Sequence, residues 1–117
     1  MAPTTLPTQT AEMIRLTLIE EAEIANAEFP QYRGYFDGWG LGIVVRDIWW
    51  GEGRFANVTL DPSNLSARKG DFVLVEPSRG YGSYGPVAYL PNSAVGSGRG
   101  IVTTCTYSQV ETVKVGA

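Results

Sequence analysis

The hydrophobic positions follow two different periodicities, and the change falls near Pro30. Before it, apolar residues recur at the spacing i, i+4, i+8 and i+11, which places them on one face of a helix. This stripe consists of Ile14, Leu18, Ala22 and Ala25. The surrounding residues are rich in Ala, Glu, Ile and Leu, which favour helices. The pattern predicts an amphipathic helix over about residues 10–28.

The ends of this helix have their own sequence signals. Thr10 is suited to the N-cap position, and Glu12 in the first turn suits the positive end of the helix dipole. Pro30 disfavours helical backbone in the residue before it and is expected to end the helix. An alternative stays open, because Ile14, Leu16 and Leu18 also alternate as they would in a strand.

After Pro30 the chain consists of short, β-like apolar runs. They cover residues 32–36, 41–50, 55–60, 72–76, 87–90, 101–107 and 110–115. The stretches between them are rich in Gly, Asp, Asn, Pro and Ser, which form turns. Six to seven short strands at this spacing predict a mainly β fold, either an antiparallel β-sandwich or a small β-barrel. With the N-terminal helix they form a single domain over residues 10–117.

Residues 1–9 form an extended arm that is rich in Pro and Thr and has no periodicity. Such a terminal segment is ordered only when it lies on another surface. That surface is either a neighbouring copy or the chain's own domain, and the sequence leaves both open. On the first alternative Pro3, Leu6 and Pro7 are candidate contact residues.

Aromatic residues are concentrated between Phe29 and Phe55, which hold eight of the thirteen in the chain and all three tryptophans. Each large ring buries roughly 150–250 Å², so the core of a small domain has room for only a few. Trp39, Trp49 and Trp50 are therefore candidate partner contacts. Because neighbouring residues of a strand point to opposite faces, we expect one ring of the Trp49–Trp50 pair to pack inward and the other to meet a partner.

Composition removes several classes of function. The chain has no histidine and one cysteine, Cys105, which argues against a histidine-based catalytic dyad, a disulfide framework and a multi-cysteine metal site. We expect no cofactor. Residues 1–30 carry five glutamates and one arginine, while the rest is nearly neutral, which argues against nucleic-acid binding. The apolar runs are far too short to span a membrane, so a soluble, cytoplasmic protein is expected unless the chain belongs to a virion.

Two residue patterns resemble catalytic motifs, and both are better explained by turns. Ser66 and Lys69 have the S-x-x-K spacing, but the companion motifs are missing. The four aspartates that could supply a glycosidase pair mostly sit beside glycine or proline, as turn residues do. They are Asp37, Asp47, Asp61 and Asp71. The glycine-rich segment 79–85 carries Tyr81 and Tyr84 and is expected to serve as a tyrosine-bearing contact loop.

The segment Lys69–Glu76 resembles the turn and strand that enter SH3-like and OB-like barrels. In overall layout the chain is similar to small β-rich virion proteins of tailed bacteriophages, the capsid decoration (cement) and head-completion proteins. That resemblance implies a non-enzymatic protein with protein partners, either further copies of itself or a viral coat protein, located on the capsid surface.

The leading hypothesis is a capsid decoration protein that stabilises a coat lattice. One alternative is a carbohydrate-binding β-sandwich whose tryptophans stack on sugar rings. A head–tail connector or another virion role is a third, and a nucleic-acid module fits the charge least well.

Overall fold

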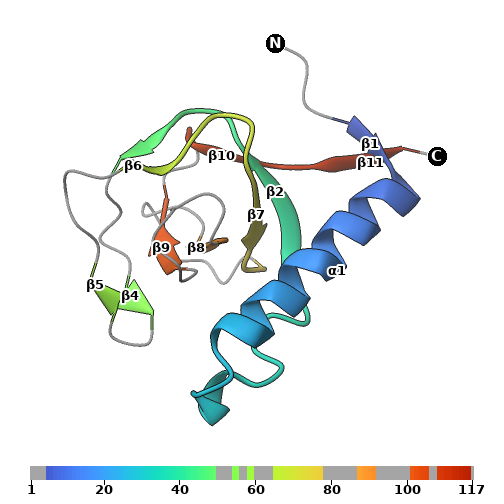
Figure 1. The fold of residues 1–117 in the computed structure, drawn as a ribbon. Coiled ribbons are helices and arrows are strands. Elements are labelled where there is room, and N and C mark those ends of the chain that lie inside the picture. The colour runs from blue at the N-terminus through green and yellow to red at the C-terminus, as the bar shows by residue number, and fades with distance from the viewer. Residues whose placement is uncertain are drawn as a thin grey trace.

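The computed structural model describes residues 5–49, 54–55, 58–59, 65–77, 87–91, 101–105 and 108–116, and the structural statements that follow refer to them. This part of the chain combines one long α-helix with a strand-rich body (Figure 1). A strand-rich domain with an N-terminal helix is what the sequence predicts. Closure into a sandwich or barrel stays a prediction.

Helix α1 spans Thr8–Ala25, so residues 14–18 are helical and the strand alternative is wrong. One face is buried, and it includes two of the predicted stripe residues. The buried residues are Ala11, Leu18, Ile19 and Ala22. Ile14 and Ala25 are half-buried at the edges of this face. The helix therefore packs through the side that its periodicity indicates.

The predicted start of α1 is wrong. Thr10 lies inside the helix, and Pro7 occupies the N-cap position without a side-chain cap. The reason is tertiary: Thr5–Pro7 forms strand β1, and the Thr8 hydroxyl donates a hydrogen bond of 3.0 Å to the Gly116 carbonyl. Glu12 lies beyond the first turn and bonds to Arg15.

The helix also ends earlier than Pro30 would require. Asn26 is buried, and both its side-chain amide and its backbone N–H donate to the Ala22 carbonyl, at 2.8 and 3.1 Å. The helical pattern fails at the next residue, where the Ala27 N–H donates to the Ile24 carbonyl at 3.3 Å, three residues back. Pro30 instead begins the short 3₁₀ helix η1, Pro30–Tyr32.

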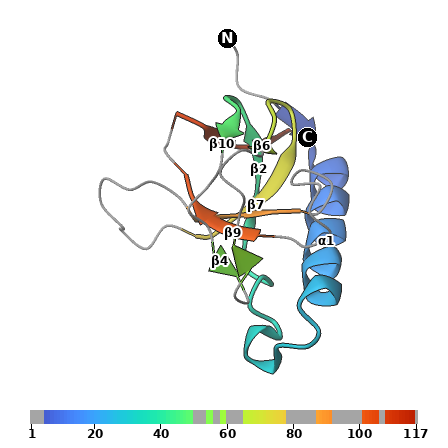
Figure 2. The same cartoon turned by 60° about the vertical axis from the view of Figure 1, so that its left-hand side comes forward.

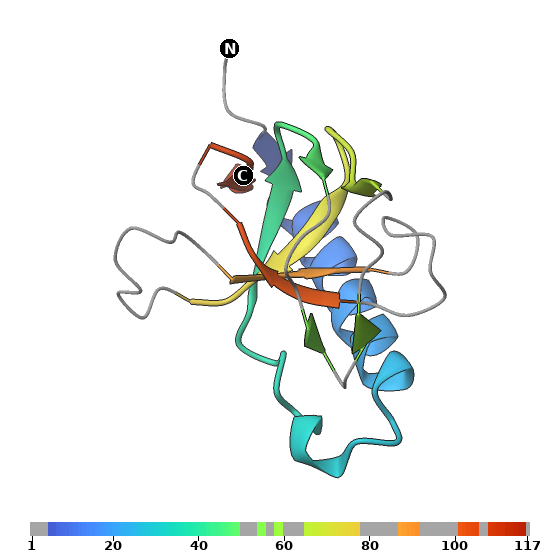
Figure 3. The ribbon, with the colours of Figure 1, turned by 90° about the vertical axis from the view of Figure 1, so that its left-hand side faces the viewer.

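The body is built on a five-stranded antiparallel sheet with the order β10-β2-β7-β8-β9. The strands are β2 (Gly40–Val44), β7 (Phe72–Val75), β8 (Val87–Leu90), β9 (Ile101–Thr104) and β10 (Val110–Thr112). Helix α1 lies along one face of this sheet (Figure 2). Figure 3 shows the same helix behind the strands.

Strands β2, β7 and β8 bury side chains on both faces of the sheet, because neighbouring residues of a strand point to opposite sides. Leu41, Leu74 and Tyr89 point toward α1 and share a hydrophobic cluster with its buried residues. Their neighbours point to the opposite face and form a second cluster that includes Ile48 and Ala67 from outside the sheet. These neighbours are Val44, Val73, Ala88 and Leu90.

Three two-stranded sheets complete the described structure. β3 (Ile48–Trp49) pairs with β6 (Leu65–Ala67), and β4 (Arg54–Phe55) pairs with β5 (Val58–Thr59). β1 pairs in parallel with β11, Lys114–Gly116. The described part of the N-terminal arm therefore lies on its own domain, which is one of the two placements the sequence allows.

The strand predictions differ in their outcome. The runs at 72–76 and 87–90 are confirmed as β7 and β8, and 101–107 contains β9. The runs at 41–50, 55–60 and 110–115 each hold two separate strands. The strand predicted at 32–36 is wrong: after η1 the chain turns, with Gly34 at a φ of +72°. β1 and β6 were not predicted.

Candidate interaction surface

Trp39, a predicted partner contact, is a core residue that is only 3% exposed. Its ring centroid lies 4.9 Å from that of Phe36 and 5.6 Å from that of Tyr35. Phe36 in turn lies 5.0 Å from Tyr89 of β8. The turn at 33–38 thus folds this part of the aromatic segment onto the sheet, and Trp39 offers no surface to a partner. The prediction for this residue is corrected accordingly.

The other predicted contact residues fall into two groups. Leu6 is half-buried and packs against the cluster beneath α1, while Pro7 is exposed. Trp49 lies in β3, but its side chain is outside the described residues. Also outside them are Pro3, Trp50, Tyr81 and Tyr84. The expected division of roles between Trp49 and Trp50 stays a prediction.

Two of the aspartates considered for catalysis hold a turn. Asp47 Oδ1 accepts the Lys69 N–H at 2.8 Å, and Asp71 Oδ2 accepts the Arg68 N–H at 3.0 Å. Both carboxylates therefore bracket the turn that leads into β7. Ser66 lies in strand β6, so the helical spacing that an S-x-x-K dyad needs is not present.

The outer face of α1, opposite the sheet, carries large apolar side chains. Met13 is 67% exposed, Leu16 52% and Ile24 70%. They follow the spacing i, i+3 and i+11, which keeps them on one side of the helix. Figure 2 shows α1 at the edge of the molecule with strands on one side only. We call Met13, Leu16, Glu20 and Ile24 the outer face of α1.

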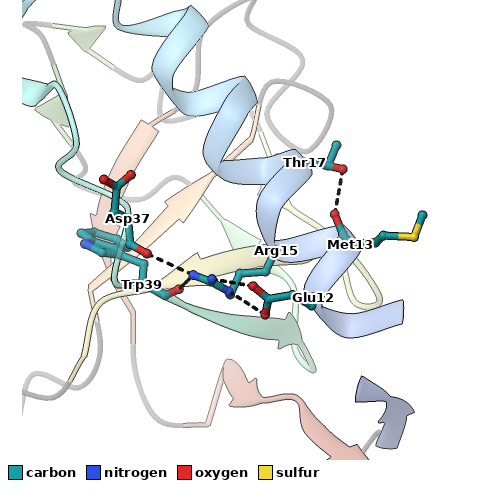
Figure 4. A network of polar contacts seen from close by, with 6 residues as sticks. All are labelled: Glu12, Met13, Arg15, Thr17, Asp37 and Trp39. Atoms are coloured by element: carbon teal, nitrogen blue, oxygen red, sulfur yellow. Dashed lines mark hydrogen bonds and ion pairs between the residues drawn. The ribbon is translucent and has the colours of Figure 1, made fainter. Parts of the chain in front are cut away.

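A shallow hollow of about 180 Å³ adjoins this face, and Met13, Ile14, Thr17 and Leu18 line it. The only hydroxyl among them belongs to Thr17, which donates 2.8 Å to the Met13 carbonyl within the helix (Figure 4). The hollow is therefore apolar in character and can receive a hydrophobic side chain.

Arg15 fastens α1 to the turn before β2. One of its terminal nitrogens donates to the carbonyls of Asp37 and Trp39, at 3.1 and 3.0 Å. Its other nitrogens bond to both Glu12 oxygens, at 2.7 and 3.2 Å (Figure 4). The hydrogen bond from Arg15 lowers the pKa of Glu12, and the same bond raises the pKa of Arg15. Glu23 holds the turn at a second point, where it accepts the Gly34 N–H at 2.8 Å.

The outer face lies in an acidic environment. Helix α1 contains four glutamates and one arginine, a net charge of −3. Because Arg15 is engaged by Glu12 and by the turn, it is directed away from the outer face (Figure 4).

Sequence reasoning missed the outer face because it followed one helical stripe. The signal was present: Met13, Leu16 and Ile24 form a second apolar stripe on the opposite side of the same helix. Apolar residues on both sides of a helix indicate that both sides are covered.

Within the described ranges, no group of three or more His, Cys, Asp or Glu residues is placed to hold a metal ion. Among the helices described, none combines the length and the apolar character needed to cross a membrane. The chain matches no protein-family model, no curated protein and no solved structure.

Proposed function

We propose that this chain is a non-enzymatic structural protein of a larger assembly, in its most specific form a viral capsid decoration protein that binds and stabilises a coat lattice. The observation that supports this proposal best is the outer face of α1. A helix packed on a sheet normally presents a polar face to solvent, whereas here Met13 and Ile24 are about two-thirds exposed on one side. Aligned apolar residues of this kind mark a surface for protein contact.

The virion role rests on the layout of the chain, a small β-rich domain with an N-terminal helix and arm. The sandwich or barrel expected for such a domain is part of the proposal. It is supported by the second hydrophobic cluster, to which Ile48 of β3 and Ala67 of β6 contribute, and by the position of β4 against β9. Closure there would leave α1 as the outermost element.

The test is the mass and composition of the native particle. If the chain decorates a coat lattice, density-gradient-purified particles from its source should contain it in many copies, spread over the whole surface in electron micrographs of antibody-labelled particles. Label at a single vertex would instead assign it to the head–tail junction. A chain recovered only as a low-mass species, with no particle carrying it, would contradict the proposal.

Carbohydrate binding loses one of its three stacking residues, because Trp39 is buried. The same purified protein can be titrated with a glycan panel while tryptophan fluorescence is followed. A saturable change would favour the carbohydrate reading over the structural one.

A further inference from the structure

We infer that the outer face of α1 is the docking surface for a partner protein whose contact surface is apolar and rimmed by lysine and arginine side chains. This inference rests on the proposed function and specifies the partner's chemistry. Three features of α1 carry it: its exposed apolar residues, the sign of the charges around them, and the engagement of its arginine.

The apolar side chains of this surface share one side of the helix, with Glu20 between Leu16 and Ile24. Glu20 is four residues from both Leu16 and Ile24 and seven from Met13, so these side chains succeed one another on one side of α1. The hollow beside Met13 and Thr17 adds a seat for a hydrophobic side chain of the partner. A side chain anchored in such a recess is typical of the centre of an interface.

The charges around these residues are negative. Glu20 lies exposed within the outer face, and Glu21 lies on one flank by helical spacing. On the other flank lie Glu12, which is paired with Arg15, and Glu23, which accepts the Gly34 N–H. Burying Glu20 against an apolar surface would be costly unless a cation faced it. Electrostatic complementarity therefore requires a partner with basic side chains at its rim.

The same charges argue against a second copy of the chain as the occupant. Two α1 helices packed face to face would bring glutamates from both sides together. The one arginine of the helix is already bonded to Glu12 and to the carbonyls of Asp37 and Trp39. It cannot neutralise the opposing helix without releasing that turn, so like charges would remain at the contact.

The partner's chemistry can be tested with two peptide probes of the same length as α1. One is an amphipathic helix of leucine and lysine, and the other has glutamate in place of each lysine. Fluorescence anisotropy of labelled peptides with the full chain should show saturable binding of the lysine peptide, weaker at high salt. Equal binding of the two peptides, or binding of neither, would overturn the inference.

Variants locate the binding on α1. Met13→Gln and Ile24→Gln should each weaken the binding of the lysine peptide. Glu20→Lys should weaken this binding by about tenfold or more, because it reverses the charge. Glu111→Lys is the matched control, since it makes the same charge change on an exposed position of β10. Circular dichroism checks that each variant is folded. Equal effects of Glu20→Lys and Glu111→Lys would contradict docking on α1.

Sedimentation velocity of the chain alone gives an independent result. We expect no self-association that depends on α1. A dimer that Ile24→Gln dissociates would assign the outer face to a second copy and overturn the inference.

The outcomes separate this inference from the proposed function. If Met13→Gln and Ile24→Gln leave the decoration of particles unchanged, the proposed function stands and the docking surface is refuted. If the chain binds the lysine peptide through Glu20 but occurs in no particle, the docking surface stands and the proposed function is refuted.

Discussion

At the residue scale, Gly42 lies where the sheet leaves least space. It sits in β2 between Val73 and Thr112 of the neighbouring strands. A Cβ placed there would lie 2.5 Å from Val75 Cγ2 and 3.0 Å from Val110 Cγ1. Only glycine lets these valines pack across the strand on the face away from α1.

We therefore expect Gly42→Ala to lower the free energy of unfolding by about 1–3 kcal/mol, because extra atoms in a packed core force its neighbours to shift. Urea denaturation measures the change. Gly38→Ala is the matched control, since a Cβ at Gly38 meets nothing within 4 Å. There the lower entropy of the unfolded chain should leave the stability unchanged or slightly higher. Equal destabilisation by the two substitutions would contradict crowding at Gly42 as the cause.

The Glu12–Arg15 pair predicts a pH dependence. Arg15 lowers the pKa of Glu12 in the folded state from its usual 4.5, so the ionised carboxylate stabilises the fold above that value. The contribution disappears as the pH falls through the lowered pKa. We expect Glu12→Gln to reduce the thermal midpoint slightly at neutral pH and to have no effect in strong acid, as followed by circular dichroism. A difference that persists in acid would contradict the pairing.

The burial of Cys105 predicts that the fold loses stability at high pH. This residue is 2% exposed, and burial raises the pKa of its thiol to about 12. As the pH rises through the usual thiol pKa of 9.0, only the unfolded chain ionises, and the fold loses stability. Cys105→Ala should show a smaller decrease in the urea midpoint over this range than the unchanged protein. Rapid labelling of the folded protein by a thiol reagent would contradict the burial.

At the scale of elements, α1 and β1 act as one unit. β1 lies along β11, Leu6 packs on the core beneath the helix, and the Thr8 hydroxyl bonds to Gly116. The segment Thr5–Pro7 therefore fixes where α1 begins. It serves the stability of its own domain, whatever residues 1–4 contact.

Two truncations should separate these roles. Removing residues 1–4 leaves β1 complete and should preserve the thermal midpoint. Removing residues 1–7 deletes β1 and Leu6, and should lower the midpoint and expose the amides of Lys114–Gly116 to faster hydrogen exchange. Unchanged exchange in Lys114–Gly116 after the longer truncation would show that β1 does not protect β11.

The sequence predicts elements well where a local pattern decides them. The helical stripe predicts α1, and apolar runs bounded by turn residues predict β7 and β8. It fails where a distant partner decides. Thr5–Pro7 is a strand only because β11 lies beside it, and Thr10 loses its capping role for the same reason. At 32–36 the aromatic residues suggested a strand, but the chain turns at Gly34, whose N–H donates to Glu23 of α1.

The candidate surface was only partly predictable for a related reason. Aromatic density indicated contact residues, and Trp39 proved to be core because the turn at 33–38 folds it under Tyr35 and beside Phe36. Tyr35 of the aromatic segment and Val115 of β11 are exposed, but Met13, Leu16 and Ile24 lie together on α1, on the side its first stripe does not use.

At the scale of the whole molecule, charge and apolar exposure coincide on one element. Strands β2, β7 and β8 bury side chains on both faces of the sheet, while α1 combines the exposed Met13, Leu16 and Ile24 with a net charge of −3. Attachment through such a surface has two components of different origin: apolar burial, which salt does not screen, and charge attraction, which it does.

If the chain is bound in an assembly through this surface, as we propose, these components predict how it detaches. Raising the ionic strength should release part of the bound chain from purified particles. Ile24→Gln should increase the released fraction at every salt concentration, because it removes apolar burial without changing charge. Gel analysis of pelleted and supernatant fractions measures both effects. Retention that is unaffected by salt and by Ile24→Gln would place the attachment elsewhere on the molecule.

The pairing of β1 with β11 also affects how the chain folds as it is synthesised. Thr8 and Gly116, which that pairing brings together, are 108 positions apart, so the contact closes a long loop at an entropic cost. Helix α1 leaves the ribosome well before β11, the strand that secures its start. Until β2, β7 and β8 have been made, the face of α1 that packs on the sheet is accessible together with the outer face. A nascent chain of this kind is most exposed to aggregation before these strands cover the helix.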